Sequence, residues 1–151
     1  MSIFHKLQVK EVRRETTDAV SVAFDVPDEL KKEFSFLPGQ YITIQKDLQD
    51  SLLRRAYSIC SSPYSGELRV AIKYVEKGRF SNYANHKLKQ GDSLDVSGPE
   101  GRFVLEIDQS NKKDYLAIAA GSGITPIMSM IKAVLEYEPQ SRFALVYGSK
   151  S

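Results

Sequence analysis

The spacing of apolar residues changes near residue 108, and this change constrains the fold more than any other feature of the sequence. Before that point apolar residues alternate with small or polar ones, as at Val20, Val22 and Phe24. Such alternation is typical of strands with one buried face. After that point, residues 115–120 form a nearly continuous apolar run, which is typical of a strand buried on both faces. The sequence therefore predicts two different kinds of sheet.

The first part of the chain predicts a small antiparallel barrel. The six expected strands cover residues 7–12, 20–26, 41–45, 54–60, 68–74 and 94–97. Turn-forming residues separate them, among them Pro38-Gly39 and Gln90-Gly91-Asp92. This pattern favours a mainly β fold, a six-stranded antiparallel Greek-key barrel that is closed or nearly closed. One capping helix interrupts the strands, with Ser81 as its predicted N-cap and its end near Gly91.

The second part predicts the start of an α/β nucleotide-binding domain. A polar connector at 109–113 is the expected boundary, which divides the chain into domains 1–108 and 109–151. Pro126 suits the first position of a helix that continues to Tyr137, and residues 143–147 form the next strand. This is one β-α-β unit. Because two parallel strands cannot cover their own apolar faces, we expect the unit to be truncated or covered by something else.

Charge, hydropathy and cysteine content exclude several classes of protein. A net charge of +2 gives no reason to expect nucleic acid or an anionic membrane as a partner. No run of 18 apolar residues predicts a membrane span, and the first ten residues lack the plan of a signal peptide. The single cysteine, Cys60, excludes a four-thiolate iron–sulfur cluster within this stretch. We expect a cytoplasmic protein with no metal site in this chain.

Three motifs carry candidate chemistry, and each is also compatible with an ordinary structural role. Arg55-Ala56-Tyr57-Ser58 ends a predicted strand. Gly78-Arg79-Phe80-Ser81 begins the helix, where free amides and the helix dipole form a natural seat for phosphate. Gly121-Ser122-Gly123-Ile124-Thr125-Pro126 joins a strand to a helix, but Pro126 stands where the third glycine of a dinucleotide fingerprint would be.

The order and spacing of these motifs resemble the ferredoxin–NADP reductase family. Phe36-Leu37-Pro38-Gly39-Gln40-Tyr41 and Gly98-Pro99-Glu100-Gly101-Arg102-Phe103 agree with it, and the resemblance covers essentially the whole chain. Members of that family pair a flavin-binding antiparallel barrel with a nicotinamide-binding α/β domain. Residues 55–61 and 78–83 look most like those of the reductases that serve a ring-epoxidising oxygenase of phenylacetyl-coenzyme A.

The resemblance implies a role for each motif residue. Arg55 is expected to pair with the FAD diphosphate, Tyr57 to lie against the isoalloxazine, and Ser58 to lie near the flavin N5, the atom that accepts hydride. Tyr57 and Ser58 are therefore the predicted catalytic residues. The predicted cofactor-binding residues are Arg55, Ala56, Tyr57, Ser58, Ile72, Lys73, Tyr74, Gly78, Arg79, Phe80, Ser81 and Thr125. The predicted nicotinamide-binding residues are Gly121, Gly123 and Thr125.

The function implied by the resemblance is that of an NAD(P)H-dependent flavin reductase. FAD is expected to accept hydride from NAD(P)H, and electrons then pass to an iron–sulfur carrier that feeds an oxygenase of aromatic degradation. A [2Fe-2S] cluster is expected only outside this chain or in a partner, and this fragment is expected to be incomplete for turnover. The alternative is a flavin-binding or docking module without catalysis. Bleaching of the flavin by NADH or NADPH distinguishes the two.

Overall fold

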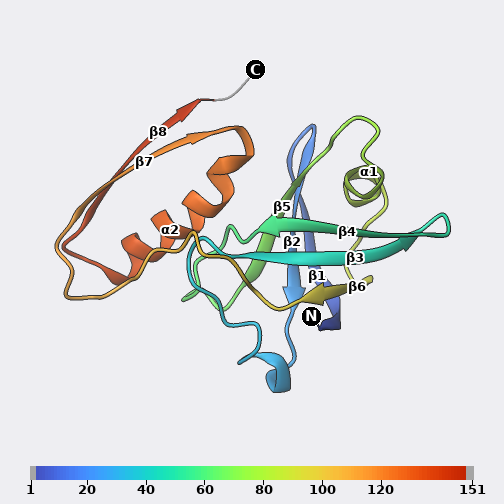
Figure 1. The fold of residues 1–151 in the computed structure, drawn as a ribbon, viewed down its shortest axis with the longest axis horizontal. Helices are drawn as coiled ribbons and strands as arrows, with labels where there is room; N and C mark the ends of the chain where they lie inside the picture. The colour runs from blue at the N-terminus through green and yellow to red at the C-terminus, as the bar shows by residue number, and fades with distance from the viewer. Residues whose placement is uncertain (1–2, 149–151) are drawn as a thin grey trace.

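The computed structural model describes residues 3–148 and contains two sheets (Figure 1). The larger is antiparallel, with its strands in the order β4-β3-β6-β1-β2-β5. Its strands are β1 (Phe4–Thr16), β2 (Ala19–Asp25), β3 (Tyr41–Leu48), β4 (Ser51–Ser58), β5 (Leu68–Lys73) and β6 (Ser93–Ser97). Because β6 returns to lie between β1 and β3, strands distant in sequence share one core. The six-stranded antiparallel fold expected from the sequence is confirmed.

The barrel is not fully closed, so of the two forms expected from the sequence, closed or nearly closed, the structure has the second. Its two edge strands, β4 and β5, are joined by the single bridge between Ile59 and Val70 and by a hydrogen bond from the Cys60 amide to the Arg69 carbonyl. The earlier residues of β4 diverge from β5, because there β4 pairs only with β3 in a long hairpin. The tip residues of this hairpin, Gln49 and Asp50, both have positive φ. The outer edge of β4 is therefore left free along most of its length.

The core of the barrel consists of the apolar residues that alternate along the strands. Val22, Ile44 and Val70 are among those with no exposed surface. The long strand β1 breaks its own alternation at a register shift between Val9 and Glu11, so that the inward-facing residues on either side of it are not an even number apart. A β-bulge of this kind bends the strand and helps the sheet to curl.

Helix α1 (Arg79–His86) caps one end of the barrel, as predicted. It buries Phe80 and Ala84 in the barrel core. The helix begins two residues before the predicted N-cap: Gly78 is the N-cap, and Ser81 is the third residue of the helix. A short 3₁₀ turn, η1 (Asp28–Leu30), lies in the loop between β2 and β3.

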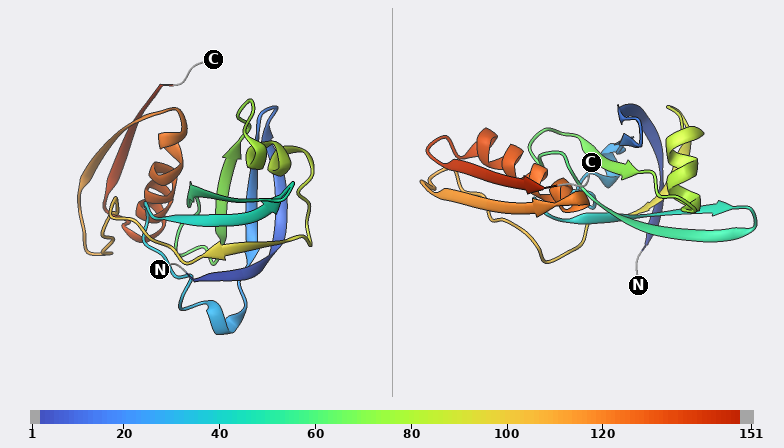
Figure 2. Two further views of the ribbon diagram at one scale, coloured as in Figure 1. Left: turned by 45° about the vertical axis from the view of Figure 1, so that its right-hand side comes forward. Right: turned by 90° about the horizontal axis from the view of Figure 1, so that it is seen from above.

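The second unit is the predicted β-α-β unit. Strands β7 (Asp114–Ala120) and β8 (Arg142–Gly148) pair in parallel, and the connection between them contains the 3₁₀ turn η2 (Gly121–Gly123) and helix α2 (Ile124–Tyr137). The helix starts two residues before Pro126, so that proline occupies its third position. Two views show α2 between the β7–β8 sheet and the barrel (Figures 1 and 2). No helix within residues 3–148 has the length and apolarity needed to cross a membrane.

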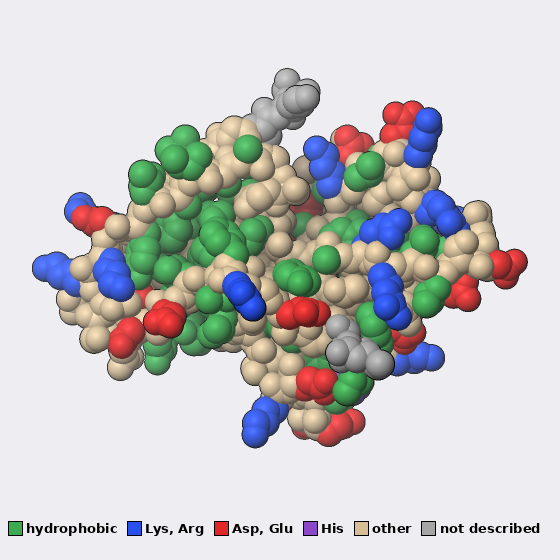
Figure 3. Space-filling view, in the orientation of Figure 1, with side chains coloured by type: hydrophobic (Ala, Val, Ile, Leu, Met, Phe, Trp, Pro, Cys, Tyr) green, Lys and Arg blue, Asp and Glu red, His purple; other side chains and the backbone are tan. Residues whose placement is uncertain are grey.

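Only one face of the β7–β8 sheet is covered, whereas the apolar run predicted burial on both faces. Tyr115, Ala117 and Phe143 turn toward α2 and pack around a small apolar cluster or against each other. On the opposite face Leu116 is 69% exposed and Ile118 is 77% exposed. Hydrophobic side chains gather over this unit in Figure 3. The bare face fits the expectation that two parallel strands cannot cover themselves.

A buried carboxylate joins the connector to the end of α2. Glu138 is 1% exposed, and its Oε2 accepts hydrogen bonds from the Asp108 amide at 3.2 Å and from Asn111 Nδ2 at 3.0 Å. Its Oε1 accepts hydrogen bonds from the Tyr115 hydroxyl at 2.8 Å and from Ser141 Oγ at 2.7 Å. Four donors replace the water that the charge loses on burial. They keep the pKa of Glu138 below its ordinary value, although burial alone raises it.

Candidate flavin and nicotinamide site

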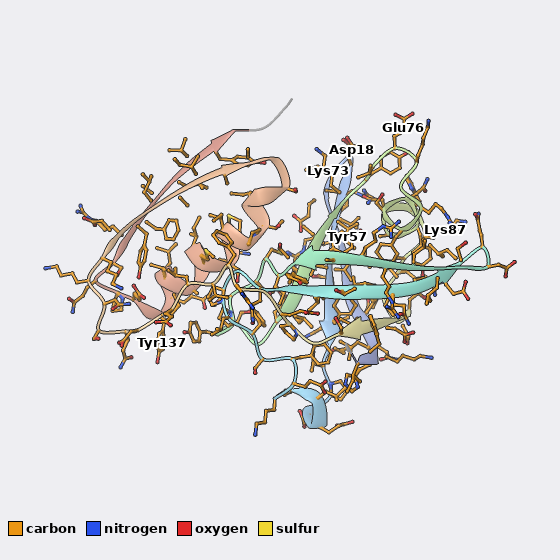
Figure 4. The ribbon with its side chains drawn as sticks, viewed as in Figure 1. Asp18, Tyr57, Lys73, Glu76, Lys87 and Tyr137 are labelled. Atoms are coloured by element: carbon orange, nitrogen blue, oxygen red, sulfur yellow. The ribbon has the colours of Figure 1, made fainter. Side chains whose placement is uncertain are left out.

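The predicted site residues of β4 lie where this edge strand diverges from the other edge strand, β5; we call this place, between β4 and α1, the opening of the barrel. Arg55 and Tyr57 are two residues apart, so their side chains share one face of the strand. Their register partners on β3 are Ile44 and Ile42, which belong to the barrel core. The face that carries Arg55 and Tyr57 is thus the inner face of the sheet. It continues beyond the Ile59–Val70 bridge, where the two edge strands meet. Figure 4 shows Tyr57 at β4, between α2 and α1.

Tyr57 connects this strand to helix α1. Its ring centroid lies 5.9 Å from that of Phe80, with an angle of 39° between the rings. Burial raises the pKa of the Tyr57 hydroxyl to about 12, and the nearby charge of Arg55 opposes the shift. The side chain is therefore neutral at physiological pH. It presents a half-buried aromatic surface with a fixed position.

Arg55 presents its guanidinium to solvent with few internal partners. Its only hydrogen bond within residues 3–148 runs from Nη1 to the Arg54 carbonyl at 2.8 Å, and no carboxylate there pairs with it. Arg54 behaves differently, since Nε donates to Gln45 Oε1 at 2.7 Å and the guanidinium lies over the Phe4 ring. Most donors of Arg55 thus remain available for an anion, and a guanidinium binds two phosphate oxygens at once.

The turn between β5 and α1 leads into the helix that contacts Tyr57 through Phe80, and its Gly78 amide donates to the Val75 carbonyl at 2.8 Å. No side chain of the described residues caps the helix at Gly78, so the amides of the first turn keep their capacity to bind an anion. The turn is held from behind, because Ser81 Oγ accepts a hydrogen bond from the Val75 amide at 3.1 Å. A Cβ on Gly78 would lie 2.6 Å from Ser81 Oγ and 3.0 Å from the Val75 carbonyl oxygen. Glycine is therefore required at this position by close packing.

The remaining predicted barrel residues lie along the two edges of the opening. Ser58 is half-buried opposite Tyr41, and its hydroxyl makes no hydrogen bond with residues 3–148. Ala56 and Lys73 are exposed. Ile72 is fully buried, so it can offer a ligand only its backbone, and its carbonyl already accepts Asn85 Nδ2 at 3.2 Å.

Sequence reasoning missed Asn85, which fixes α1 in place. Besides its bond to β5, its Nδ2 donates to the Ser81 carbonyl at 2.9 Å, and its Oδ1 accepts from Arg14 at 2.9 Å. The side chain is 5% exposed and fully hydrogen-bonded. A lone asparagine in a helix gives no sequence signal for this role, because its partner Arg14 lies on β1. Tyr74 also steadies the helix through an edge-to-face contact with His86 at 5.7 Å.

The predicted nicotinamide residues lie in the second unit, at the carboxyl end of β7. Gly121 and Gly123 form the exposed turn η2, and an added Cβ at either would have no neighbour within 4 Å. Thr125 Oγ1 donates to the Ser122 carbonyl at 2.9 Å. In Figure 1 the first turn of α2 lies beyond the carboxyl end of β4 and helix α1 lies beside the strand, and Figure 3 shows a recess between the two units on this face. A parallel unit binds ligands at the carboxyl ends of its strands.

Cys60 is a packed residue and not a reactive thiol. Burial raises its pKa, which is the largest influence on it, and the nearby charge of Lys132 opposes the shift. A thiol that stays protonated at neutral pH is a poor nucleophile. No cluster of three His, Cys, Asp or Glu side chains in residues 3–148 has the arrangement of a metal site.

The antiparallel sheet carries an arginine without a carboxylate partner and leads into a helix without a side-chain cap. A parallel unit with a glycine turn follows it. This combination is typical of the class of flavin- and nicotinamide-binding oxidoreductases. Comparison with known families agrees with this class. Residues 6–105 match the oxidoreductase FAD-binding domain, and residues 117–151 match the oxidoreductase NAD-binding domain. The chain belongs to the family of oxidoreductase FAD-binding domains of the ferredoxin reductase type.

Individual relatives belong to oxygenase systems. The chain is 45% identical over all its 151 residues to one component of the 1,2-phenylacetyl-CoA epoxidase of Escherichia coli, and covers 42% of that protein. It is 36% identical, over 95% of its length, to the ferredoxin reductase component of the 3-ketosteroid-9-alpha-monooxygenase of Rhodococcus rhodochrous, and covers 40% of it. The structure of phthalate dioxygenase reductase superposes with a TM-score of 0.73 at 25% identity, over 98% of this chain and 44% of that one. The chain thus spans less than half the length of each.

Proposed function

We propose that the chain binds FAD at the opening between β4 and α1, with the diphosphate between Arg55 and residues 78–81. The observation that carries this proposal is the combination of a guanidinium that has one internal hydrogen bond and no carboxylate partner with a helix N-terminus that has no side-chain cap. Both groups favour phosphate, and two of them suit a diphosphate better than a monophosphate. The donor set present therefore fits FAD.

The other residues of the opening position the flavin ring. The half-buried Tyr57 ring provides an aromatic surface that shields one face of the isoalloxazine from water. The free Ser58 hydroxyl is available to the flavin N5. The backbone of Ile72, Lys73 and Tyr74 follows the ribityl chain. When bound, FAD supplies a ring that accepts hydride from a nicotinamide and releases electrons singly.

The nicotinamide nucleotide is placed on the turn of Gly121 and Gly123, with Thr125 directed to the flavin from the second unit. This arrangement needs no general acid or base, because hydride passes between two rings held in contact. The chain's task is to align the rings and exclude water. NADH or NADPH is the reductant in this proposal, and the division of labour follows the domains 1–108 and 109–151.

The electron acceptor is proposed from the relatives. Two of them are named as parts of an epoxidase and of a monooxygenase, and the phthalate dioxygenase reductase is described as passing electrons from pyridine nucleotides to [2Fe-2S]. We infer that this chain feeds electrons to an iron–sulfur domain or protein, and through it to an oxygenase of aromatic degradation, with phenylacetyl-coenzyme A as the candidate substrate. We place the protein in the cytoplasm, where a single reduced cysteine is expected.

A second candidate is a flavin-binding or docking module without catalysis. It is favoured by the open surroundings of the glycine turn, where an added Cβ at Gly121 or Gly123 would meet nothing within 4 Å. The side chain that contacts Gly121 is Tyr147, whose hydroxyl donates to the Gly121 carbonyl at 3.3 Å. This alternative keeps the FAD site but removes the reductant.

One experiment separates the two. FAD-loaded protein is mixed anaerobically with NADH or with NADPH, and the visible absorbance of the flavin is followed. Bleaching by either nucleotide supports the reductase, whereas yellow protein that does not bleach supports the module. Protein that fails to take up added FAD contradicts both.

A further inference from the structure

Helix α2 is tied to the barrel by hydrogen bonds directly beyond β4. The Oγ of Ser129, which is fully buried, donates to the Ser61 carbonyl at 2.6 Å. One turn later, Lys132 Nζ donates to the Cys60 carbonyl at 3.2 Å. These bonds join a segment of the barrel to a helix of the second unit.

The residues joined by these hydrogen bonds lie close in sequence to the two halves of the proposed site, the flavin half on the barrel and the nicotinamide half on α2. On the barrel side, Ser61 lies three residues beyond Ser58. On the helix side, Ser129 lies four residues beyond Thr125, so the two side chains share one face of α2. The segment between Ser58 and Ser61 is itself fixed, because Ile59 is fully buried and its amide donates to the Gln40 carbonyl at 2.9 Å.

Resting on the proposed function, we propose that Ser129 is a positioning residue: its hydrogen bond to Ser61 sets the separation between the nicotinamide turn and the flavin-facing end of β4. Hydride transfer is sensitive to this separation, since a misplacement of about 1 Å can cost on the order of 100-fold in rate. The half-buried Lys132 adds a second hydrogen bond between α2 and the same loop of the barrel. The stacked rings of Tyr64 and Tyr137, whose centroids are 4.5 Å apart, hold the carboxyl end of the helix.

Ser129→Ala removes the hydrogen bond to the Ser61 carbonyl. Lys132→Met removes the hydrogen bond to the Cys60 carbonyl at a half-buried position, without the loss of a buried hydroxyl. Ser65→Ala is the matched control, because Ser65 Oγ also donates to a backbone carbonyl of this loop, that of Ser62 at 2.7 Å, but makes no hydrogen bond to the described residues of α2. Two readouts are compared. The first is the limiting rate of flavin reduction at saturating NADH or NADPH, measured with FAD affinity and nicotinamide affinity. The second is the distance distribution between nitroxide labels at Lys6→Cys and Glu136→Cys in a Cys60→Ser background.

The expected result is a broader or shifted distance distribution in Ser129→Ala and Lys132→Met. It is accompanied by a limiting rate lower by on the order of tenfold, with FAD affinity unchanged. Ser65→Ala should match the wild type in both readouts. An unchanged distance distribution, or a changed distribution with an unchanged limiting rate, would overturn the proposal. Wild-type protein that holds FAD but is not reduced contradicts the proposed function, and the distances then still decide whether Ser129 holds the helix.

Discussion

The ring of Tyr57 lies 5.9 Å from the ring of Phe80, and this contact joins strand β4 to helix α1, the two elements between which we propose that FAD binds. Phe80 is 1% exposed and belongs to the barrel core. The aromatic surface and the amides of residues 78–81 are therefore set by the same packing.

Tyr57 should make stability depend on alkaline pH. Its pKa is about 12 in the folded protein and near 10 when exposed, so the folded state holds the proton over that range and the unfolded state loses it. The stability due to the neutral buried hydroxyl is complete below pH 10 and is lost as the pH rises toward 12. Urea unfolding at about pH 9 and about pH 11 should show a larger loss in the wild type than in Tyr57→Phe. Equal losses would show that Tyr57 is not shielded.

Arg55→Ala should weaken FAD binding by about 2–3 kcal/mol, the range expected for a charge-assisted, bidentate contact. The matched control is Arg54→Ala, since Arg54 already binds Gln45 and lies over the Phe4 ring. That variant should keep the affinity of the wild type. Calorimetric titration of flavin-free protein gives both values. The assignment of the diphosphate fails if the two variants lose affinity equally.

Ser58→Ala should slow the reduction of the bound flavin without weakening the binding of FAD. Because the hydroxyl has no partner within residues 3–148, its removal leaves the fold and the retention of FAD nearly intact. Reduction of the bound flavin by NADH or NADPH should become slower. Stopped-flow absorbance measures the rate, and ultrafiltration measures the FAD that remains bound. Loss of FAD without a separate effect on the rate would remove the role assigned to Ser58.

Glu138→Gln should destabilise the second unit by about 2–3 kcal/mol, because the amide turns a donor toward groups that already donate. Glu136→Gln on the exposed side of the same helix should have little effect. Because hydrogen bonding keeps the pKa of Glu138 below its ordinary 4.5, its contribution is present above that pH and is lost as the pH falls through the lowered value. Thermal unfolding of both variants at neutral and acidic pH measures this. Equal stability of the two variants would contradict it.

Much of the fold could be predicted because its strands and helices show in the local spacing of apolar residues. Alternation located β2 and β5, short stretches of β-type composition located the other four barrel strands, and the run at 115–120 located the parallel strand β7. The open edge could not be predicted, since it depends on the β3–β4 hairpin, whose turn uses Gln49 and Asp50 at positive φ. Positive φ is most common at glycine, asparagine and aspartate, so Asp50 alone, without a glycine beside it and with Gln49 before it, gave too weak a signal. The predicted start was three residues late for α1 and two residues late for α2, because Ser81 and Pro126 suit several positions of a first turn.

The motif residues of the candidate site could be named from the sequence, but their supports could not. Arg55 and Gly78 stand in recognisable motifs. Asn85, Ser129 and Phe80's contact with Tyr57 depend on partners brought together only by the fold. Long-range contacts of single polar residues leave no period or spacing in the sequence.

The most direct test of the central claim compares FAD with FMN. Flavin-free wild type is titrated with each, beside Gly78→Ala, whose new Cβ would displace the turn, and Gly123→Ala, whose new Cβ meets nothing. The wild type and Gly123→Ala should bind FAD clearly more tightly than FMN, while Gly78→Ala should lose most of this preference. Equal affinities for the two flavins in the wild type would contradict the account, because residues 78–81 would then not bind the second phosphate.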